Sequence, residues 1–502
     1  MIRKFHLSSF IPTKWLSILV TFAVITTAGI SAAREITLDD ALSVAVGQSS
    51  RGNIIAGNFQ VAEQNYRARK INFYVPEISI NGSLPSYNRA RRYDFAQGAT
   101  DRSLIETRDL GLSSFIRLKQ SLITGGDLEV TANLTADDYR RPNLNPNFPD
   151  AEFVYEDNRR GYFSFNYAQP LLKPSESKYE LHNRRDDLEI ARYTRLQEEQ
   201  ALKTEVTETY MGVLQTALAE EIASLKARQG ILQAEIDSMK LSDGILSEEE
   251  YLESSSSRLD AELEQFEAQT AAREKMRELA MLLDFDVSEP IDAVTPVVSR
   301  QLTEQMRQDL IDSWESTVAI KKAEYEYRKS ERAADYAASS HGLTGDLALS
   351  YSLGKEDART EISEYALNTR SKLNTNSWGI ALNFTYPIWD GGASEAAVMA
   401  SQHQADQSRL EFEKTKRSAR AEIINAVNRL DVSRQRLSIV EKQIGLAENR
   451  LSIAEERYAD GQISELTYLE SRISYLEAKD RYLEELKKYL VNWIELDYKY
   501  AG

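Results

Sequence analysis

A twelve-residue stretch occurs twice in this sequence, and the spacing of its two copies constrains the fold more than any other feature. Residues 243–254 read DGILSEEEYLES and residues 460–471 read DGQISELTYLES, with eight identical positions and no gap. Pro170 and Pro387 are separated by the same 217 residues, so about 85 residues align without an insertion. A duplication of this length indicates two copies of one structural unit.

The segment that keeps its spacing is predicted to be helical. One inserted residue turns the rest of an α-helix by ~100°, whereas a loop absorbs insertions at little cost. Residues 393–458 contain no proline and a single glycine, Gly445. Apolar residues recur there every seventh position, as in a helix that packs along one face, at Ile423, Leu430, Leu437, Ile444, Leu451 and Tyr458. The equivalent run from Ser175 to Ser242 is on the order of 100 Å long if helical.

The residues ahead of each proline are predicted to form strands, at about 77–171 and 345–387. Apolar side chains alternate there with small or polar ones, as at Trp378, Ile380 and Leu382. A period of two is the pattern of a strand with one apolar face. Because no sequence remains to cover that face, we expect it to contact lipid. A soluble β-domain joined to a coiled coil is the alternative reading of the same strands.

The first copy holds 44 extra residues ahead of Pro170. They include a predicted hairpin near 110–136, with its turn at Thr124-Gly125-Gly126. Between other strands, residues 137–160 and 354–375 are predicted to be long polar loops. An open sheet cannot lie in lipid because its edges are unpaired, so several chains are expected to share one barrel.

The N-terminus reads as a secretory leader over residues 1–33. Basic residues precede an apolar stretch from Trp15 to Ile30, and Ser31-Ala32-Ala33 supplies a cleavage site after Ala33. An N-terminal membrane anchor is the alternative, although the apolar stretch is short for one. The chain has no cysteine and a formal net charge of −17, which argues against nucleic acid as a partner.

Nothing in the sequence indicates an enzyme. No nucleophile–base pattern, phosphate-binding loop or metal-ligand spacing is present, so we expect no catalytic residue, cofactor or bound metal. His182, His341 and His403 have no ligand-type neighbours at suitable spacing.

The mature chain resembles the TolC family of outer-membrane efflux proteins over essentially its whole length. The resemblance rests on the duplication together with the stretches ITLDDALSVAV (36–46), QPLL (169–172) and YPIWDGG (386–392). It implies an α+β membrane protein: a homotrimer whose shared transmembrane β-barrel continues into a long α-helical periplasmic barrel. Family members have twelve strands per trimer, and the extra hairpin raises that number to eighteen if it joins the wall. The organisation expected is a first repeat at 34–286, a linker at 287–300 and a second repeat at 301–502.

The function that the resemblance implies is a passive outer-membrane channel of a tripartite efflux or type I secretion system, in a Gram-negative-type cell. Its expected partners are outer-membrane lipid, a periplasmic adaptor protein and an inner-membrane pump. A surface adhesin with a coiled-coil stalk is the alternative, but here helices follow strands twice and the chain ends in a helix. The exported substrate and the class of pump are not encoded in any readable motif.

Each duplicated stretch is predicted to be the turn of a helical hairpin. Gly244 and Gly461 suit a left-handed residue after a helix, and Ser247 and Ser464 suit the N-cap of the returning helix. Asp243 and Asp460 precede the glycines in the turn. The residues Tyr251, Tyr468, Leu252 and Leu469 are either hairpin core or, as the resemblance implies, part of an adaptor-docking surface that also includes the two aspartates.

The resemblance also implies a gate at these tips, built on acidic positions. The family's positions fall on Glu470 and Thr467 in the second tip and on Glu250 in the first, where Ser247 and Glu250 also form a capping-box pattern. Glu253 is the counterpart of Glu470. The gating tyrosine matches Tyr458, and its arginine partner is replaced by Ile463. A ring of carboxylates predicts cation selectivity.

Overall fold

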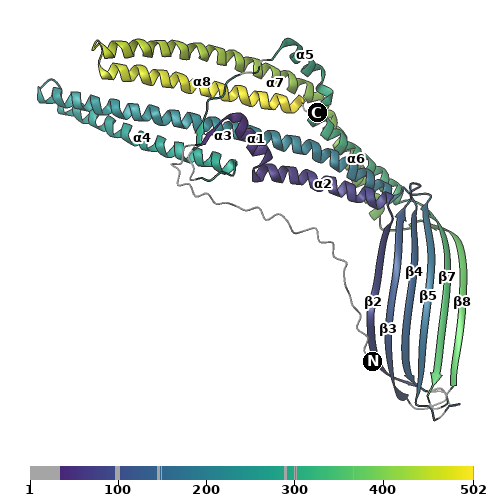
Figure 1. Ribbon diagram of the computed structural model, residues 1–502. Helices are drawn as coiled ribbons and strands as arrows, with labels where there is room; N and C mark the ends of the chain where they lie inside the picture. The colour runs from purple at the N-terminus through teal and green to yellow at the C-terminus, as the bar shows by residue number, and fades with distance from the viewer. Residues whose placement is uncertain are drawn as a thin grey trace, which may run out of the picture.

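The computed structural model describes residues 34–95, 102–143, 147–148, 150–287, 291–298, 300, 302–363, 365 and 367–500. The predicted cleavage site at Ala33 lies outside these residues. The molecule is elongated, with a sheet at one end and the turns of two helical hairpins at the other (Figure 1). It is a mixed helical and sheet protein, as the sequence predicted.

The elements of the first half of the chain are β1 (Arg34–Ile36), α1 (Leu38–Gly47), α2 (Ser50–Tyr74), β2 (Glu77–Phe95), β3 (Arg102–Ser121), β4 (Asp127–Pro142), β5 (Phe153–Pro170), α3 (Glu176–Ser242) and α4 (Glu248–Leu282). Those of the second half are β6 (Ile291–Ala293), α5 (Glu304–Asp312), the 3₁₀ helix η1 (Trp314–Ser316), α6 (Val318–Ser340), β7 (Thr344–Ile362), β8 (Leu367–Thr385), α7 (Ala393–Ala459) and α8 (Glu465–Tyr500).

The large sheet is six-stranded, antiparallel throughout, and follows the order β2-β3-β4-β5-β7-β8. The predicted hairpin near 110–136 is therefore part of the sheet, since it falls on β3 and β4, between β2 and β5. Within the chain the sheet does not close, and β2 and β8 are its two edges.

The prediction of long polar loops at 137–160 and 354–375 is wrong. β4 continues to Pro142 and β5 begins at Phe153, while β7 and β8 are separated only by residues 363–366. The sequence misled because these strand halves carry polar side chains on both faces, so the alternation of apolar residues stops while the backbone pairing continues. Cross-strand ion pairs stabilise the extension; for example, Arg370 Nε donates to Asp357 Oδ1 at 2.6 Å.

The helices α3 and α7 each contain 67 residues, and their starts are 217 residues apart, the offset of the sequence duplication. Each forms an antiparallel hairpin with the shorter helix that follows it, α3 with α4 and α7 with α8 (Figure 1). The two hairpins are joined because α3 also packs against α8. No described helix has the length and apolarity needed to cross a membrane.

A small parallel sheet that the sequence did not predict lies midway along the helices. β1 pairs with β6, which falls inside the predicted linker at 287–300. The hydroxyl of Tyr210 on α3 donates to the carbonyls of Ile36 and Val294, at 2.8 and 2.7 Å. Burial raises the pKa of Tyr210 to about 12, so the hydroxyl remains a donor at neutral pH. This tyrosine ties the start of the first repeat and the linker to the long helix.

Burial along α7 decreases from its middle towards its tip. Ile423, Leu430 and Leu437 are buried, whereas Tyr458, on the same heptad seam, is 39% exposed. The hydrophobic core of the chain is thus concentrated where α3, α7 and α8 meet near β1 and β6.

Candidate functional site

One face of the sheet is apolar across all six strands in the half of the sheet nearer the helices. Residues directly opposite one another in neighbouring strands share a face. The register places one residue from every strand in a single row, and each member is apolar: Ile78, Leu118, Val130, Phe165, Tyr351 and Trp378. Trp378 at the edge is 76% exposed.

The opposite face at the same level is polar. Its row, one residue along each strand, consists of Ser79, Arg117, Thr131, Ser164, Ser352 and Ser377. The hydroxyls of Ser352 and Ser377 are hydrogen-bonded at 2.7 Å, and Arg117 pairs with Glu129 at 3.2 Å. A sheet that is apolar on one side and polar on the other suits a boundary between lipid and water.

The tip of the first hairpin has the predicted turn. Gly244 adopts φ +70°, and the N–H of Ile245 donates to the carbonyl of Lys240 at 2.8 Å. Ser247 then caps α4: its hydroxyl accepts from the N–H of Glu250 at 3.3 Å, and the Glu250 carboxylate accepts from the N–H of Ser247 at 2.9 Å. The predicted capping box is thereby confirmed.

The second tip repeats this geometry without the carboxylate. Gly461 adopts φ +68°, and the N–H of Gln462 donates to the carbonyl of Arg457 at 2.8 Å. The hydroxyl of Ser464 accepts from the N–H of Thr467 at 3.3 Å. Both predicted left-handed glycines and both predicted serine caps are therefore confirmed.

The carboxylate of Glu250 is already engaged in the cap. Hydrogen bonds from Ser247, first from its backbone N–H and then from its hydroxyl, hold the pKa of Glu250 below its usual range. Glu253, Thr467 and Glu470 are exposed at their tips and lie on α4 and α8.

The two tips differ in what they expose. Leu252 is 60% exposed, whereas Leu469, at the equivalent position of the second copy, is 3% exposed and buried. Tyr251 and Tyr468 are both half-buried, and Asp243 and Asp460 directly follow the helices that they end. The repeated leucine therefore packs inside the hairpin at the second tip, whereas at the first tip it is exposed to solvent.

Tyr458 does not stand alone at the second tip. Its ring stacks on that of Tyr468, with 5.1 Å between centroids and 9° between planes, and so joins α7 to α8. The hairpins are linked to each other by ion pairs between α3 and α8: Arg472 with Glu221 at 2.9 Å, and Arg228 with Glu465. Sequence reasoning missed these pairs, because only the packing of α3 against α8 brings residues from the two repeats together.

Among the described residues no group of His, Asp or Glu side chains has the geometry of a metal site. The arrangement provides a sheet with one apolar and one polar face at one end of the molecule and two helix tips at the other.

Solved structures with the same fold are outer-membrane channels or membrane proteins. The chain superposes on the CmeC outer membrane channel of Campylobacter jejuni with a TM-score of 0.57 and 12% identity, covering 93% of this chain and 85% of that one. For VceC of Vibrio cholerae the TM-score is 0.55 at 13% identity, covering 92% and 95%. A membrane protein from Pseudomonas aeruginosa gives 0.55 at 16% identity, covering 93% of each chain. No curated protein matches the sequence.

The chain thus shares its fold with solved outer-membrane channels. Residues 312–501 match the model of the family described as outer membrane efflux protein. The resemblance seen in the sequence is confirmed by this match together with the fold.

Proposed function

We propose that the protein is the outer-membrane channel of a tripartite efflux or type I secretion system. It is a passive duct from the periplasm to the exterior, with its sheet in the outer membrane and its helices in the periplasm. The observation that carries the proposal is the pair of rows across the sheet, one wholly apolar and one wholly polar, followed on the same chain by helices of 67 residues. The sheet of such a chain can face water on one side while it contacts lipid on the other.

Three copies complete the wall in this proposal. The edges β2 and β8 each run for 19 residues with one side unpaired in the chain, which lipid does not tolerate. Pairing β2 of one copy with β8 of the next closes the sheet. With six strands in each copy, the closed barrel of a homotrimer has eighteen strands, a size at which barrels enclose an aqueous channel.

The helix tips form the periplasmic entrance, and the ion pairs between α3 and α8 hold it closed. The family's arginine position is occupied by Ile463, whereas Arg228–Glu465 and Arg472–Glu221 join the two hairpins of one copy close to the tips. The stacked Tyr458 and Tyr468 hold the second hairpin together as it moves. Opening then requires α8 to separate from α3.

A periplasmic adaptor docks on the tips, and an inner-membrane pump drives export through it. The exposed Leu252 favours the first tip as the main apolar contact, because the equivalent Leu469 is buried. Asp243, Gly244, Ser247 and Tyr251 belong to the same tip, with their counterparts in the second tip at Asp460, Gly461, Ser464 and Tyr468.

Reconstitution tests the proposal. The mature protein, purified in detergent, should form trimers by native mass spectrometry and cation-selective channels in planar bilayers, since Glu253 and Glu470 place exposed carboxylates near the entrance. Because the chain has no cysteine, a single cysteine in β2 and another in β8 report edge pairing by an intermolecular disulfide. A protein that stays monomeric and water-soluble without detergent would refute the channel.

A further inference from the structure

The apolar face of the sheet becomes polar and cationic at one level, towards the end of the sheet away from the helices. Two rows beyond the fully apolar one, the register aligns Gly82, Ser114, Leu134, Gly161, Lys355 and Asn374. The next row contains Leu112, Ala136, Arg159, Asp357 and Lys372. On β8 this level, at Asn374, is eleven residues from the helix end of the strand at Thr385. That is about 37 Å of strand, or about 26 Å of height at a tilt of ~45°, close to the height of the lipid-facing band of outer-membrane barrels. The cations therefore begin where the hydrocarbon should end.

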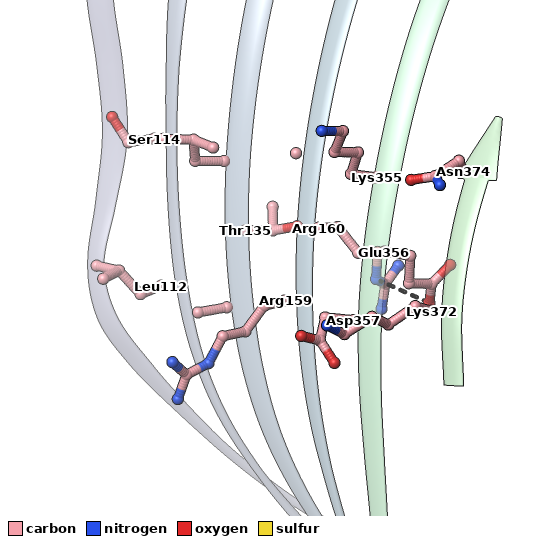
Figure 2. A pocket seen from close by; sticks show the side chains of 13 residues that line it. Leu112, Ser114, Thr135, Arg159, Arg160, Lys355, Glu356, Asp357, Lys372 and Asn374 are labelled. Carbon is pink, nitrogen blue, oxygen red and sulfur yellow. Dashed lines mark ion pairs between the residues drawn. The ribbon is translucent and has the colours of Figure 1, made fainter. Parts of the chain in front are cut away.

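A hollow lies at this border, around Gly161. It has a volume of about 670 Å³, and Figure 2 shows Lys355 and Lys372 on one side of it and Leu112 on the other, with the side chain of Arg159 extending towards the side of Leu112. A second hollow of about 350 Å³ shares Gly161 and continues over the apolar rows to Phe163 and Leu353. The combined site has a cationic half and an apolar half, and the missing side chain of Gly161 lies where they meet.

The cationic half has unused positive charge. Asp357 accepts from Arg370 at 2.6 Å, and Arg159 pairs with Asp157 at 3.2 Å within its own strand. Lys355 and Lys372 are exposed and make no ion pair within 4 Å with any residue that the structure describes, although Asp357, which already pairs with Arg370, lies directly opposite Lys372 in the register. Two ammonium groups without a close ion-pair partner, beside an apolar surface, complement a lipid that carries phosphate.

We propose that this site binds a phosphate-bearing glycolipid of the outer leaflet. One acyl chain lies over Phe163 and Leu353, and a phosphate group lies between Lys355 and Lys372. The proposal rests on the proposed function only in placing this face of the sheet in an outer membrane. The apolar half favours a lipid over a free anion, and the position on the side away from the helices favours the outer leaflet.

Binding of purified lipid A, a bis-phosphorylated and acylated disaccharide, to the detergent-solubilised protein tests the site. We expect Lys355→Gln/Lys372→Gln to bind it about 30-fold more weakly than wild type, since each cation at a charged bilayer surface contributes about fivefold. The matched control, Arg117→Gln/Lys119→Gln, removes two positive charges from the opposite, polar face and should bind like wild type. Equal binding by wild type and Lys355→Gln/Lys372→Gln would overturn the proposal.

A second variant fills the hollow without changing charge. A Cβ at position 161 meets only Leu134 Cδ2, at 3.4 Å, so Gly161→Leu fits the fold. It should weaken lipid A binding about tenfold, and equal affinity would contradict the assignment. Dephosphorylated lipid A should bind more weakly, and displacement of lipid A by millimolar inorganic phosphate would instead identify a free-anion site and refute the lipid. Conductance of the same preparations separates the two proposals: channels that open normally but do not bind lipid A refute this site alone.

Discussion

The guanidinium of Arg472 on α8 lies 2.9 Å from the carboxylate of Glu221 on α3, so one ion pair joins the two halves of the duplicated chain. Arg228 and Glu465 form a second such pair closer to the tips. Both pairs are partly exposed, and each is worth only about 0–1 kcal/mol to folding. Their importance is positional, because they lie between α3 and α8, the helices through which the two hairpins pack against each other.

Removing the carboxylates should open the channel. In Glu221→Gln/Glu465→Gln, α8 is no longer held against α3 by charge, so we expect a higher open probability in planar bilayers with little change in thermal stability. Glu495→Gln is the control, since Glu495 pairs with Arg429 at 2.6 Å inside one hairpin. Identical gating of the double variant and wild type would exclude these ion pairs as the closing contacts.

The two faces of the sheet should respond oppositely to a charge. Trp378→Arg places a cation on the apolar face, where it costs about 2–4 kcal/mol near the bilayer midplane. Ser377→Arg, the neighbouring position on the polar face, should cost far less. Unfolding by denaturant in lipid vesicles measures both. If Ser377→Arg is the more damaging of the two, the assignment of lipid and water sides is reversed.

The glycines of the helix turns should resist substitution. Gly244→Ala and Gly461→Ala each force a Cβ into the left-handed region, at φ +70° and +68°, and should destabilise the hairpins by about 1 kcal/mol. The Cβ itself meets nothing within 4 Å at either site, so backbone strain is the only cost. Gly445→Ala, in the interior of α7, is the matched control and should stabilise by about 0.5–1 kcal/mol. Melting temperatures that fall equally for all three would argue against the left-handed turn.

Glu484 should make stability depend on pH in acid. Its hydrogen bond with Lys487, ahead of that with Gln215, lowers the pKa of Glu484 to about 2 from 4.5. The carboxylate therefore stabilises the fold at pH values above 4.5, and this contribution is lost as pH falls towards 2. Glu484→Gln should cost about 1 kcal/mol at pH 7, after allowance for solvent screening, and nothing near pH 2. Chemical denaturation at both pH values measures the difference.

Asp480, one helical turn before Glu484, should have the opposite effect on how stability depends on pH. Burial raises the pKa of Asp480, so its ionised form is unfavourable in the folded state at neutral pH. Asp480→Asn should consequently increase stability at pH 7 and leave it unchanged well below pH 3.8, where the carboxyl is already protonated in both states. A loss of stability at pH 7 would mean that the charge of Asp480 is needed for packing.

The sequence was sufficient for the features that repeat with a fixed period. The 217-residue offset placed α3 and α7 to within a residue, and the glycine–serine spacing of the tips determined both turns. Alternation located the strand halves next to the helices. It failed where the strands leave the apolar band, because Arg370 and Asp357 pair across strands that are polar on both sides.

Contacts between the repeats could not be read from the chain. β1 and β6 are three residues each and pair across more than 250 positions, and no periodicity marks such short strands. The pairing of Arg472 with Glu221 depends on the angle at which α8 meets α3, which the sequence of either helix does not specify. The cationic border at Lys355 and Lys372 became visible only once the register aligned them on one face.

The two unpaired edges, β2 and β8, also determine how a population of these chains responds to damage. The proposed ring of three needs every junction, so one defective edge spoils the whole ring, including its two sound members. In a cell that makes intact and edge-defective chains in equal amounts, random mixing leaves about one ring in eight without a fault. Lesions in β2 or β8 should therefore be dominant, while lesions in the exposed tip at Leu252 should be diluted by intact neighbours.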